Sequence, residues 1–401
     1  MRIIYLHQYF HTPAVAGSIR SYEMARRFVL WGHEVHLITA DRASNRGAYQ
    51  TEEAGIQVHW LDVPYSNMLG TAGRIRAFFQ FAWGAAYKAA ALEGDLIFAT
   101  STPLTVALPA VYAAKRKRVP MVFEVRDLWP ELPIAMGTLR GWPLKGAARW
   151  LERFAYRNAA QVVALSPGMK EGVVRAGYPA SRVHVIPNSA DLDLFDVPAS
   201  AGAEFRAAYP WLGDRPLVLY AGTLGAINGV DYLARLAAAL RARAPEVRFL
   251  VIGHGPDEAK IRALASELGV LDENFFMIPK VPKAEMPAIL SATTVATSLF
   301  IDLEEMWVNS ANKFFDALAS GTPVAINYGG WQAALLGEHD AGLVLDPHDI
   351  DVSAHKLFER LSDEAWLARA GKNARQLAQT RFARDDLARE LEAVLLRAAH
   401  R

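Results

Sequence analysis

The chain has 401 residues, of which 52% are hydrophobic and 21% charged, so it folds and is too long for one hydrophobic core. Its 43 Lys and Arg nearly balance 42 Asp and Glu, which argues against a general nucleic-acid binder. The absence of cysteine excludes disulfide bonds and thiolate chemistry. The first apolar run is too short for a signal peptide, and no run reaches the ~18 residues of a membrane span, so we expect a cytoplasmic protein.

Short apolar runs alternate with helical patterns through the first half of the chain. The runs predict strands at residues 1–6, 34–39, 95–99, 120–124, 161–165 and 183–186. Between them, amphipathic patterns predict helices at residues 20–32 and 105–117. This alternation is typical of a parallel sheet covered by helices on both faces.

The second half repeats the alternation. It predicts strands at residues 216–221, 247–253, 275–278, 294–300 and 323–327, with helices at residues 230–243, 257–268, 285–292 and 312–319. An aperiodic stretch rich in Pro, Gly and Ala, residues 195–215, separates the halves. The fold class is therefore α/β, with two doubly wound, Rossmann-like domains, which we place at residues 1–200 and 201–380.

A glycine-bearing loop, YAGTLGAINGVD, follows the first strand of the second half and precedes a helix. Gly222, Gly225 and Gly229 allow a ligand to approach the backbone, and the helix N-terminus favours an anion. A tight turn without a ligand explains the same residues equally well. The glycine spacing differs from the dinucleotide fingerprint, which disfavours an NAD-dependent dehydrogenase.

A second candidate segment reads NSANKFFDALASGT, residues 309–322. Ser310 or Asn312 could cap a helix whose first N–H groups meet a diphosphate, with Lys313 as a point charge. Asp316 falls on the same helical face as Lys313, where it could accept hydrogen bonds from a ribose diol. A capped amphipathic helix with surface charges is the alternative.

Polar residues also follow strands of the first half. Arg126, Asp127 and Glu131 come directly after the strand at residues 120–124, at the edge where open α/β sheets bind ligands. The alternative is a polar loop with an Arg–Asp ion pair.

Three further candidates, His7, Gly17 and Arg20, follow the first strand, although a single histidine is often structural. The chain has no His-Glu-x-x-His pair and no Asp-x-Asp motif after a strand. We therefore expect no catalytic metal and no cofactor.

Five segments occur in a characteristic order: RDLWPE, ALSPGMKEGVVRAGYPASRVHVIPNSADLDLF, YAGTLGAINGVDYL, VIGHGP and NKFFDALASGTPVAINYGG. Together they resemble the retaining glycosyltransferases of the GT-B fold, family four, especially a bacterial branch of L-fucosamine transferases in surface-polysaccharide assembly. The resemblance implies two Rossmann-like domains facing across a cleft, with a final helix, residues 381–401, that packs back on the first domain. It also implies that the acceptor binds the N-terminal domain and the sugar nucleotide the C-terminal one.

The resemblance assigns roles to individual residues. It places Gly17 in the acceptor-side loop, Gly222–Gly225 near the diphosphate and Asp316 at the ribose, with no family role carried over to Thr223 or Asn228. Our full candidate sets are His7, Gly17, Arg20, Arg126 and Glu131 for the acceptor, and Gly222, Thr223, Gly225, Asn228, Lys280, Asn312, Lys313 and Asp316 for the donor. Asp127 and Lys313 take the catalytic positions. Three departures stand out: the family's Pro-Asn-Gly is Pro187-Asn188-Ser189 here, its first Glu is Val308, and its two diphosphate-binding cations are Thr223 and Asn228. Lys313, or else Lys280, is our candidate to replace those cations.

The expected reaction transfers a sugar, such as an N-acetylated deoxyhexosamine, from a UDP-linked donor to a hydroxyl of a lipid-linked glycan in O-antigen or related synthesis. The anomeric configuration is retained, Lys313 stabilises the leaving diphosphate, and Asp127 positions the acceptor or acts as an auxiliary base. A sugar-nucleotide epimerase, a phosphorylase and a catalytically silent sugar-nucleotide-binding relative are the alternatives.

Aromatic and basic residues concentrate in the first half, at residues 74–88 and in the basic run at residues 115–118. Such a combination could hold the N-terminal domain against an anionic membrane leaflet, as a peripheral protein on the inner face of the plasma membrane. A buried helix beside a solvated basic turn explains the residues equally well.

Overall fold

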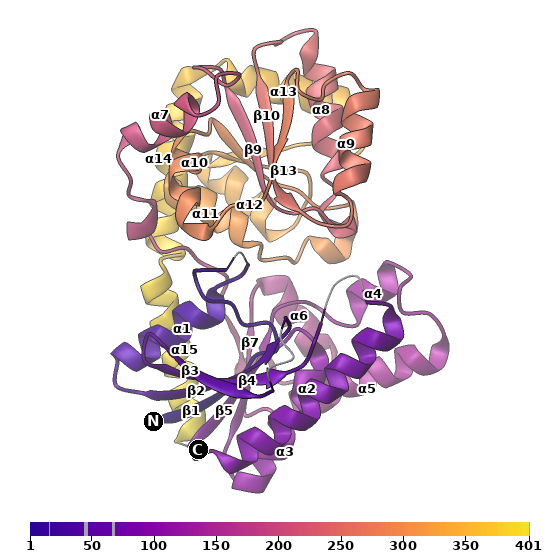
Figure 1. The fold of residues 1–401 in the computed structure, drawn as a ribbon, viewed down its shortest axis with the longest axis vertical. Helices are drawn as coiled ribbons and strands as arrows, with labels where there is room; N and C mark the ends of the chain where they lie inside the picture. The colour runs from indigo at the N-terminus through magenta and orange to yellow at the C-terminus, as the bar shows by residue number, and fades with distance from the viewer. Residues whose placement is uncertain (16, 44–46, 66–68, 401) are drawn as a thin grey trace. The chain divides into compact units, whose positions relative to one another are not determined.

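A computed structural model describes residues 1–15, 17–43, 47–65 and 69–400. The chain divides into two compact units, each built around one sheet (Figure 1). Unit 1 comprises Met1–Thr12, Gly17–Pro187 and Asp385–Arg401, and unit 2 comprises Pro13–Ala16 and Asn188–Arg384. In each unit, the carboxyl edge of the parallel sheet is where ligands are expected to bind.

The sheet of unit 1 has eight strands in the order β3-β4-β2-β1-β5-β6-β7-β8. Their bounds are β1 (Arg2–Leu6), β2 (Glu34–Asp41), β3 (Tyr49–Glu53), β4 (Ile56–Asp62), β5 (Leu96–Thr100), β6 (Met121–Val125), β7 (Gln161–Ala164) and β8 (Val183–Val185). All pairings are parallel except that of β3 with β4. The sequence did not predict β3, because its polar residues YQTEE lie on an exposed edge, nor β4 beside it.

Helices cover both faces of this sheet: α1 (Arg20–Leu30), α2 (Thr71–Ala91), α3 (Ala107–Lys117), α4 (Glu131–Ala135), α5 (Trp142–Asn158), α6 (Pro167–Arg175) and α15 (Arg384–Ala399). Figure 1 shows α1 and α15 on one side of the sheet, with α2 and α3 on the other. Two short 3₁₀ helices, η1 (Leu104–Val106) and η2 (Ala180–Arg182), precede α3 and β8.

The last helix packs on the first one. Asp385 accepts from Arg27 over 2.6 Å, and Glu392 contacts the ring of His33 over 2.7 Å. The guanidinium of Arg389 lies 3.5 Å from the ring centroid of Trp31, a cation–π contact. These side chains fix α15 to unit 1, although the preceding segment of that unit ends far earlier in the chain, at Pro187.

The sheet of unit 2 has six parallel strands in the order β11-β10-β9-β12-β13-β14. They are β9 (Leu217–Thr223), β10 (Arg248–His254), β11 (Phe275–Ile278), β12 (Val295–Ser298), β13 (Val324–Ile326) and β14 (Gly342–Val344). After β11 the chain returns to the other side of β9, so the strand order reverses between β9 and β12. The carboxyl end of such a switch point is where open α/β sheets bind ligands.

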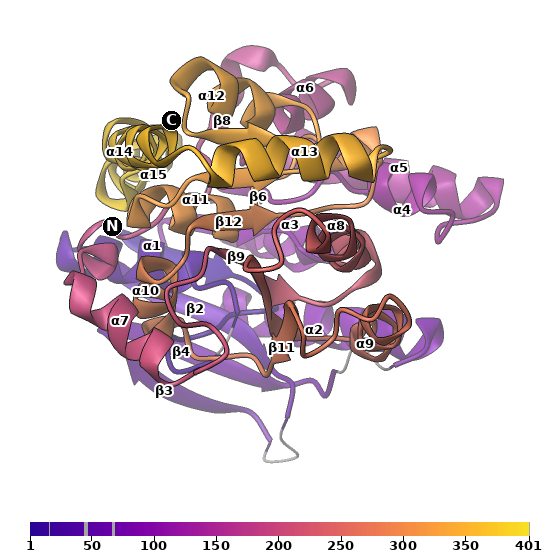
Figure 2. The same cartoon turned by 90° about the horizontal axis from the view of Figure 1, so that it is seen from above.

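The helices of unit 2 are α7 (Ala199–Ala207), α8 (Asp231–Arg241), α9 (Glu258–Glu267), α10 (Met286–Ser291), α11 (Asn312–Ser320), α12 (Trp331–His339), α13 (Ile350–Leu361) and α14 (Glu364–Arg381). Four 3₁₀ helices lie in its loops: η3 (Asp193–Phe195), η4 (Ala226–Asn228), η5 (Lys283–Glu285) and η6 (Glu304–Met306). Figures 1 and 2 show α8 and α9 on one side of the sheet and α10 and α11 on the other. Fully buried Val218, Leu236, Phe249 and Leu357 join strands and helices into one apolar core.

The predicted strands and helices of both halves agree with the structure, with ends that differ by a few residues. The stretch at residues 195–215, predicted to be aperiodic, instead contains α7, which packs on α10. Arg206 of α7 donates to the carbonyl oxygen of Ala292 just beyond α10. Helix α7 therefore belongs to unit 2, whose first residue after unit 1 is Asn188, and residue 200 falls inside this helix.

Candidate functional site

The carboxyl end of β9 holds a lysine side chain at the switch point of unit 2. The Lys313 amine, from the first turn of α11, donates to the Tyr220 hydroxyl over 2.9 Å. The same nitrogen lies 4.2 Å from the Tyr220 ring centroid and 5.5 Å from that of Phe300. The Tyr220 hydroxyl in turn donates to the Thr223 carbonyl oxygen over 2.8 Å, which fixes its orientation. Lys313 is thus held against the end of β9.

This lysine has no carboxylate partner among the residues that the structure describes. Burial lowers the pKa of Lys313 from its ordinary value to about 7. Burial of a cation without a counter-charge is unfavourable, because the cation loses its hydration. An anion bound beside it would supply polar contacts and balance its charge. The position is electrostatically suited to an anionic ligand.

The glycine loop beside Lys313 requires glycine at specific positions. A Cβ on Gly222 would lie 3.1 Å from the Lys313 amine, so a side chain there would compete with it. Gly229 has a φ of +55°, and a Cβ on it would lie 3.2 Å from the backbone nitrogen of Ile301. At Gly225 an added Cβ would meet Asn228 at 3.5 Å and Thr223 at 3.7 Å, both ordinary contact distances. Gly222 and Gly229 therefore shape the site, whereas Gly225 has steric room.

Two predicted donor residues in this loop are uncharged and differ in exposure. Thr223, the last residue of β9, is exposed. Asn228 has an exposed fraction of only 8%. Its backbone N–H donates to the Gly225 carbonyl oxygen over 2.9 Å. Asn228 thus brings a largely buried side-chain amide to the loop beside Gly225.

Asp316, the predicted ribose ligand, forms an ion pair with Lys283. Both side chains are largely buried, with 11% and 15% exposed, and the Lys283 amine lies 5.2 Å from the ring centroid of Phe195. Lys280, the predicted second cation, is instead exposed after β11, and no hydrogen bond or ion pair involves it among the described residues. The sequence missed Lys283, which lies three residues after Lys280 at the start of η5 and whose contact with α11 no local pattern indicates.

The start of α11 differs from the predicted capping. Its N-cap residue is Ala311, whose backbone N–H donates to the Asn309 side chain over 3.1 Å. The Ser310 hydroxyl accepts from the Asn188 backbone over 3.0 Å and does not cap the helix. Asn312 is the first helical residue. The interpretation that Ser310 or Asn312 caps α11 was wrong, because the Ser310 hydroxyl accepts from Asn188 and Asn312 already lies inside the helix, after the N-cap Ala311.

In unit 1, the Arg126 guanidinium joins one further predicted residue, His7, and a serine that the sequence did not single out. It contacts His7 Nε2 over 3.2 Å and donates to the Ser18 hydroxyl over 2.8 Å. Burial and the charge of Arg126 hold the pKa of His7 well below its usual value. His7 is therefore neutral, and its Nε2 accepts from Arg126, which leaves the proton on the buried Nδ1. The structure records no partner for Nδ1.

Arg20 has a different position from the one predicted. Its side chain is fully buried, and it donates to Glu124 over 2.9 Å and to the carbonyl oxygens of Ile186 and Pro187. Burial opposes the charge of Glu124, but Arg20, Arg126 and Thr100 together hold its pKa below the ordinary value. Every guanidinium nitrogen of Arg20 thus donates to another residue of the protein. Arg20 is therefore not available to contact an acceptor substrate directly.

The remaining predicted residues of unit 1 do not form one cluster in the described contacts. Asp127 is exposed directly after β6, while Glu131 begins α4 and is half-buried. A Cβ on Gly17 would lie 2.8 Å from a ring nitrogen of His11. Burial and the Glu131 charge raise the pKa of Glu152, on α5, to about 7. Asp127 is therefore accessible, and Glu131 belongs to a carboxylate pair with Glu152.

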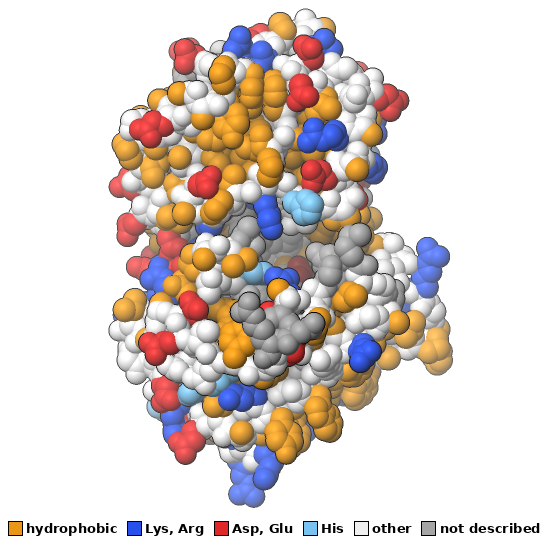
Figure 3. Space-filling model, in the orientation of Figure 1, with side chains coloured by type: hydrophobic (Ala, Val, Ile, Leu, Met, Phe, Trp, Pro, Cys, Tyr) orange, Lys and Arg blue, Asp and Glu red, His pale blue; other side chains and the backbone are white. Residues whose placement is uncertain are grey.

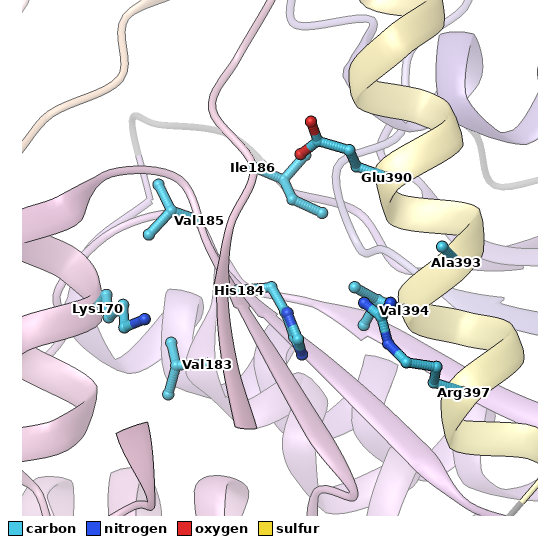
Figure 4. Close-up of a pocket in the computed structure, with 9 residues that line it drawn as sticks. All are labelled: Lys170, Val183, His184, Val185, Ile186, Glu390, Ala393, Val394 and Arg397. Atoms are coloured by element: carbon cyan, nitrogen blue, oxygen red, sulfur yellow. The ribbon is translucent and has the colours of Figure 1, made fainter. Parts of the chain in front are cut away.

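Unit 1 also has a hollow of about 340 Å³, away from all the predicted site residues. Figure 4 shows that its lining comes from α6, β8 and α15, with Lys170, His184 and Arg397 among the side chains. Gln161 lies 2.9 Å from the His184 ring. The hollow is a shallow surface feature beside α15.

The residues that the structure describes also lack two other kinds of feature. No group of three or more His, Cys, Asp or Glu side chains suited to a metal ion occurs among them. In the same residues, no helix has the length and apolarity needed to cross a bilayer.

Family models match both halves of the chain. Residues 17–189 match the Glycosyl transferase 4-like domain, and residues 203–377 match Glycosyl transferases group 1. A curated relative is the GDP-mannose-dependent alpha-(1-6)-phosphatidylinositol monomannoside mannosyltransferase of Mycolicibacterium smegmatis. It is 27% identical over 244 residues, which cover 59% of this chain and 62% of the relative, so the match spans less than two thirds of that protein.

Solved structures extend the likeness over nearly the whole chain. Sucrose-phosphate synthase from Thermosynechococcus elongatus superposes with a TM-score of 0.80 at 18% identity, covering 98% of each chain. An Anabaena protein solved with UDP-glucose gives a TM-score of 0.74 at 18% identity, covering 98% of this chain and 99% of its own. At such identities the likeness establishes the fold.

Proposed function

Because this chain belongs to the glycosyltransferases with the GT-B fold, we propose that it moves a sugar from a nucleoside diphosphate to a hydroxyl of a lipid-linked glycan, with retention at the anomeric carbon. The observation that carries the proposal is the Lys313 amine beside Gly222 at the switch point of unit 2, which has no carboxylate partner among the described residues. A diphosphate fits this position because it supplies the negative charge that the site lacks.

Lys313 takes the place of the two family cations that are Thr223 and Asn228 here. It approaches the glycine loop from α11, on the other side of the switch point, so the charge reaches the same loop from a different element. Asn228 adds a neutral donor from its buried amide. The helix N-terminus of α11 contributes a favourable dipole to a bound anion.

Asp316 and Lys283 support a site for the nucleoside. A carboxylate held by one lysine amine retains free lone pairs, and these can accept from the two hydroxyls of a ribose. Lys283 thereby becomes a positioning residue for Asp316. Asn312, next to Lys313, and Lys280, at the end of β11, stay in the proposed donor set as peripheral contacts.

In the proposed reaction, the acceptor oxygen bonds to the anomeric carbon on the face from which the diphosphate leaves. The bond between that carbon and the phosphate oxygen breaks, and the hydroxyl proton passes to the leaving phosphate. Lys313 in its protonated form stabilises the charge that develops there, without a metal ion. Asp127 is accessible after β6 and is proposed to position the acceptor, with Arg126, His7, Gly17 and Glu131 on the acceptor side.

For the donor we propose a UDP-linked sugar, such as an N-acetylated deoxyhexosamine, on the resemblance to L-fucosamine transferases. The mycobacterial relative is named for GDP-mannose, so a GDP-linked donor is the competing choice. That relative is also named for a lipid-linked acceptor, which supports a lipid-linked glycan here. Synthesis of a surface polysaccharide such as O-antigen, at the inner face of the plasma membrane, is the proposed setting.

The test is a calorimetric screen of UDP, GDP, ADP and TDP, with and without EDTA, followed by product analysis with the matching sugar conjugates. We expect one diphosphate to bind equally well in EDTA and its conjugate to glycosylate an added acceptor glycan. Products formed from donor alone would indicate an epimerase, and a requirement for inorganic phosphate would indicate a phosphorylase. Binding of no diphosphate would contradict the proposed donor site.

A further inference from the structure

Six aromatic side chains of unit 1 are more than half exposed. No other aromatic side chain among the described residues is exposed to that extent. The six are Phe79 (56%), Trp83 (78%), Tyr87 (77%), Tyr112 (52%), Trp142 (87%) and Trp150 (60%). Isolated exposed aromatics need no explanation, but a concentration of all of them in one region of the surface marks an interaction site.

These side chains lie on three helices that pack side by side. On α2, Ile75, Phe79, Trp83 and Tyr87 recur every four residues and so follow one face of the helix. Helix α2 packs on α3, and α3 packs on α5. We call the exposed side chains of α2, α3 and α5 the aromatic surface. In Figure 3, hydrophobic side chains with Lys and Arg among them cover the region where Figure 1 draws α2 and α5.

The same helices are strongly basic. They contain ten Lys and Arg residues and one acidic residue, Glu152, in a chain whose formal net charge is only +1. Glu152 is 3% exposed and so does not offset the charge at the surface. Exposed Arg76, Arg116, Arg149 and Arg153 make no salt bridge with any described residue. The positive charge of the aromatic surface is therefore available to a partner.

We propose that the aromatic surface docks unit 1 on an anionic lipid bilayer, with the aromatic rings in the headgroup region and the cations on lipid phosphates. Tryptophan and tyrosine favour the membrane interface, and each cation near an anionic leaflet adds attraction. The aliphatic side chains of Ile75 and Leu144, 48% and 59% exposed, also gain from an apolar phase.

A second copy of this chain is the less suitable occupant. Two aromatic surfaces placed face to face would oppose ten cations with ten others, and only the buried Glu152 could offset them. The lipid proposal deepens the proposed setting at the inner face of the plasma membrane, and it does not depend on the identity of the donor or the acceptor. It concerns unit 1 alone, whereas the donor site lies in unit 2.

The test is flotation of the full chain with vesicles of phosphatidylcholine alone or mixed with phosphatidylglycerol, at low and high salt. We expect binding to the anionic vesicles at low salt and a loss of about tenfold or more in affinity at high salt. A double variant, Trp83→Ser with Trp150→Ser, and a charge variant, Arg149→Glu with Arg153→Glu, should each weaken binding about tenfold or more.

Matched controls are Leu30→Ser, which removes a 72% exposed hydrophobic side chain outside the aromatic surface, and Lys260→Glu with Arg262→Glu on α9. Both should bind vesicles like the unchanged chain, and all variants should retain its melting temperature and its affinity for the nucleoside diphosphate.

The proposal is overturned if the unchanged chain binds neither kind of vesicle, or if the variants of the aromatic surface bind like the controls. A dimer in light scattering that Trp83→Ser with Trp150→Ser dissociates would instead assign the surface to a second copy. Loss of diphosphate binding alone would concern the donor site and leave the docking proposal standing.

Discussion

The Lys313 amine and the Tyr220 hydroxyl are 2.9 Å apart, and this contact joins the two elements that flank the switch point of unit 2. Tyr220 lies on β9 and Lys313 on α11, which follows β12. Burial raises the pKa of Tyr220, so its hydroxyl stays protonated and can donate to Thr223 while it accepts from Lys313. The amine is therefore held at the glycine loop by a neutral partner, and its charge remains for a ligand.

Replacing Lys313 with Met should weaken binding of the nucleoside diphosphate. A charge-assisted hydrogen bond contributes about 2 kcal/mol, so we expect about thirty-fold weaker binding by calorimetry. Lys260→Met is the matched control, because it removes an exposed lysine of the same unit, on α9 and outside the proposed donor set, and should change affinity less than about threefold. Equal losses in the two variants would show that Lys313 has no special contact with the diphosphate.

Binding of the diphosphate should depend on pH through Lys313. Its pKa is about 7 in the unliganded protein, below the ordinary 10.5, and a bound anion raises it. Above pH 7 binding must therefore take up a proton, and affinity should fall as the pH rises through 7 toward 9. Calorimetry at pH 8 in buffers of different ionisation enthalpy measures this uptake. Lys313→Arg, which stays charged, should abolish it; uptake that persists in this variant would assign the proton to another group.

The same pKa predicts how Lys313 affects folding stability. Because the folded pKa lies below the unfolded value, the unfolded chain binds more protons between pH 7 and 10.5. The contribution of Lys313 to stability therefore improves as the pH rises over this range. Denaturant unfolding of Lys313→Met should show a gain over the unchanged chain that is largest below pH 7 and diminishes toward pH 10. A gain that does not change with pH would contradict a desolvated amine.

A side chain at Gly222 should disturb the donor site. In Gly222→Ala, the new Cβ would lie 3.1 Å from the Lys313 amine, so the amine must move and diphosphate affinity should fall several-fold. Gly225→Ala provides a steric control in the same loop, because its Cβ would meet Asn228 and Thr223 at 3.5 and 3.7 Å, which are ordinary contact distances. We expect that variant to bind the diphosphate nearly normally. Calorimetry on the pair distinguishes a local clash from a general effect on the loop.

The sequence predicted the alternation of strands and helices well, because buried parallel strands are apolar throughout, as in LIFAT of β5. It missed β3, whose exposed polar residues carry no such pattern. For the site, spacing placed Lys313 and Asp316 on one helix face, but it could not show that one meets Tyr220 and the other Lys283. Those partners are about 93 and 33 residues away in the chain, and local periodicity contains no information on such contacts.

Arg20 and Glu124 should determine stability rather than acceptor binding. Removing one member of a buried, hydrogen-bonded ion pair costs about 3–5 kcal/mol, so Glu124→Gln and Arg20→Met should each lower the free energy of unfolding by about this amount. The double variant Arg20→Met with Glu124→Met should recover much of the loss. Because the pKa of Glu124 is below its ordinary 4.5, the pair's contribution is present above that pH and is lost as the pH falls below it. Wild-type stability in either single variant would restore Arg20 to the acceptor site.

Asp316 should recognise the ribose of the donor, and this can be measured separately from the diphosphate. The unchanged chain should bind a 2′-deoxynucleoside diphosphate about tenfold less tightly than the ribonucleotide, because one hydrogen bond to the carboxylate is lost. Asp316→Asn should bind the ribonucleotide more weakly and discriminate less between the two. Lys283→Met tests the positioning role, since without its ion pair Asp316 is less fixed and discrimination should also decline. Unchanged discrimination in Asp316→Asn would mean that the ribose binds elsewhere and that the ion pair with Lys283 is structural.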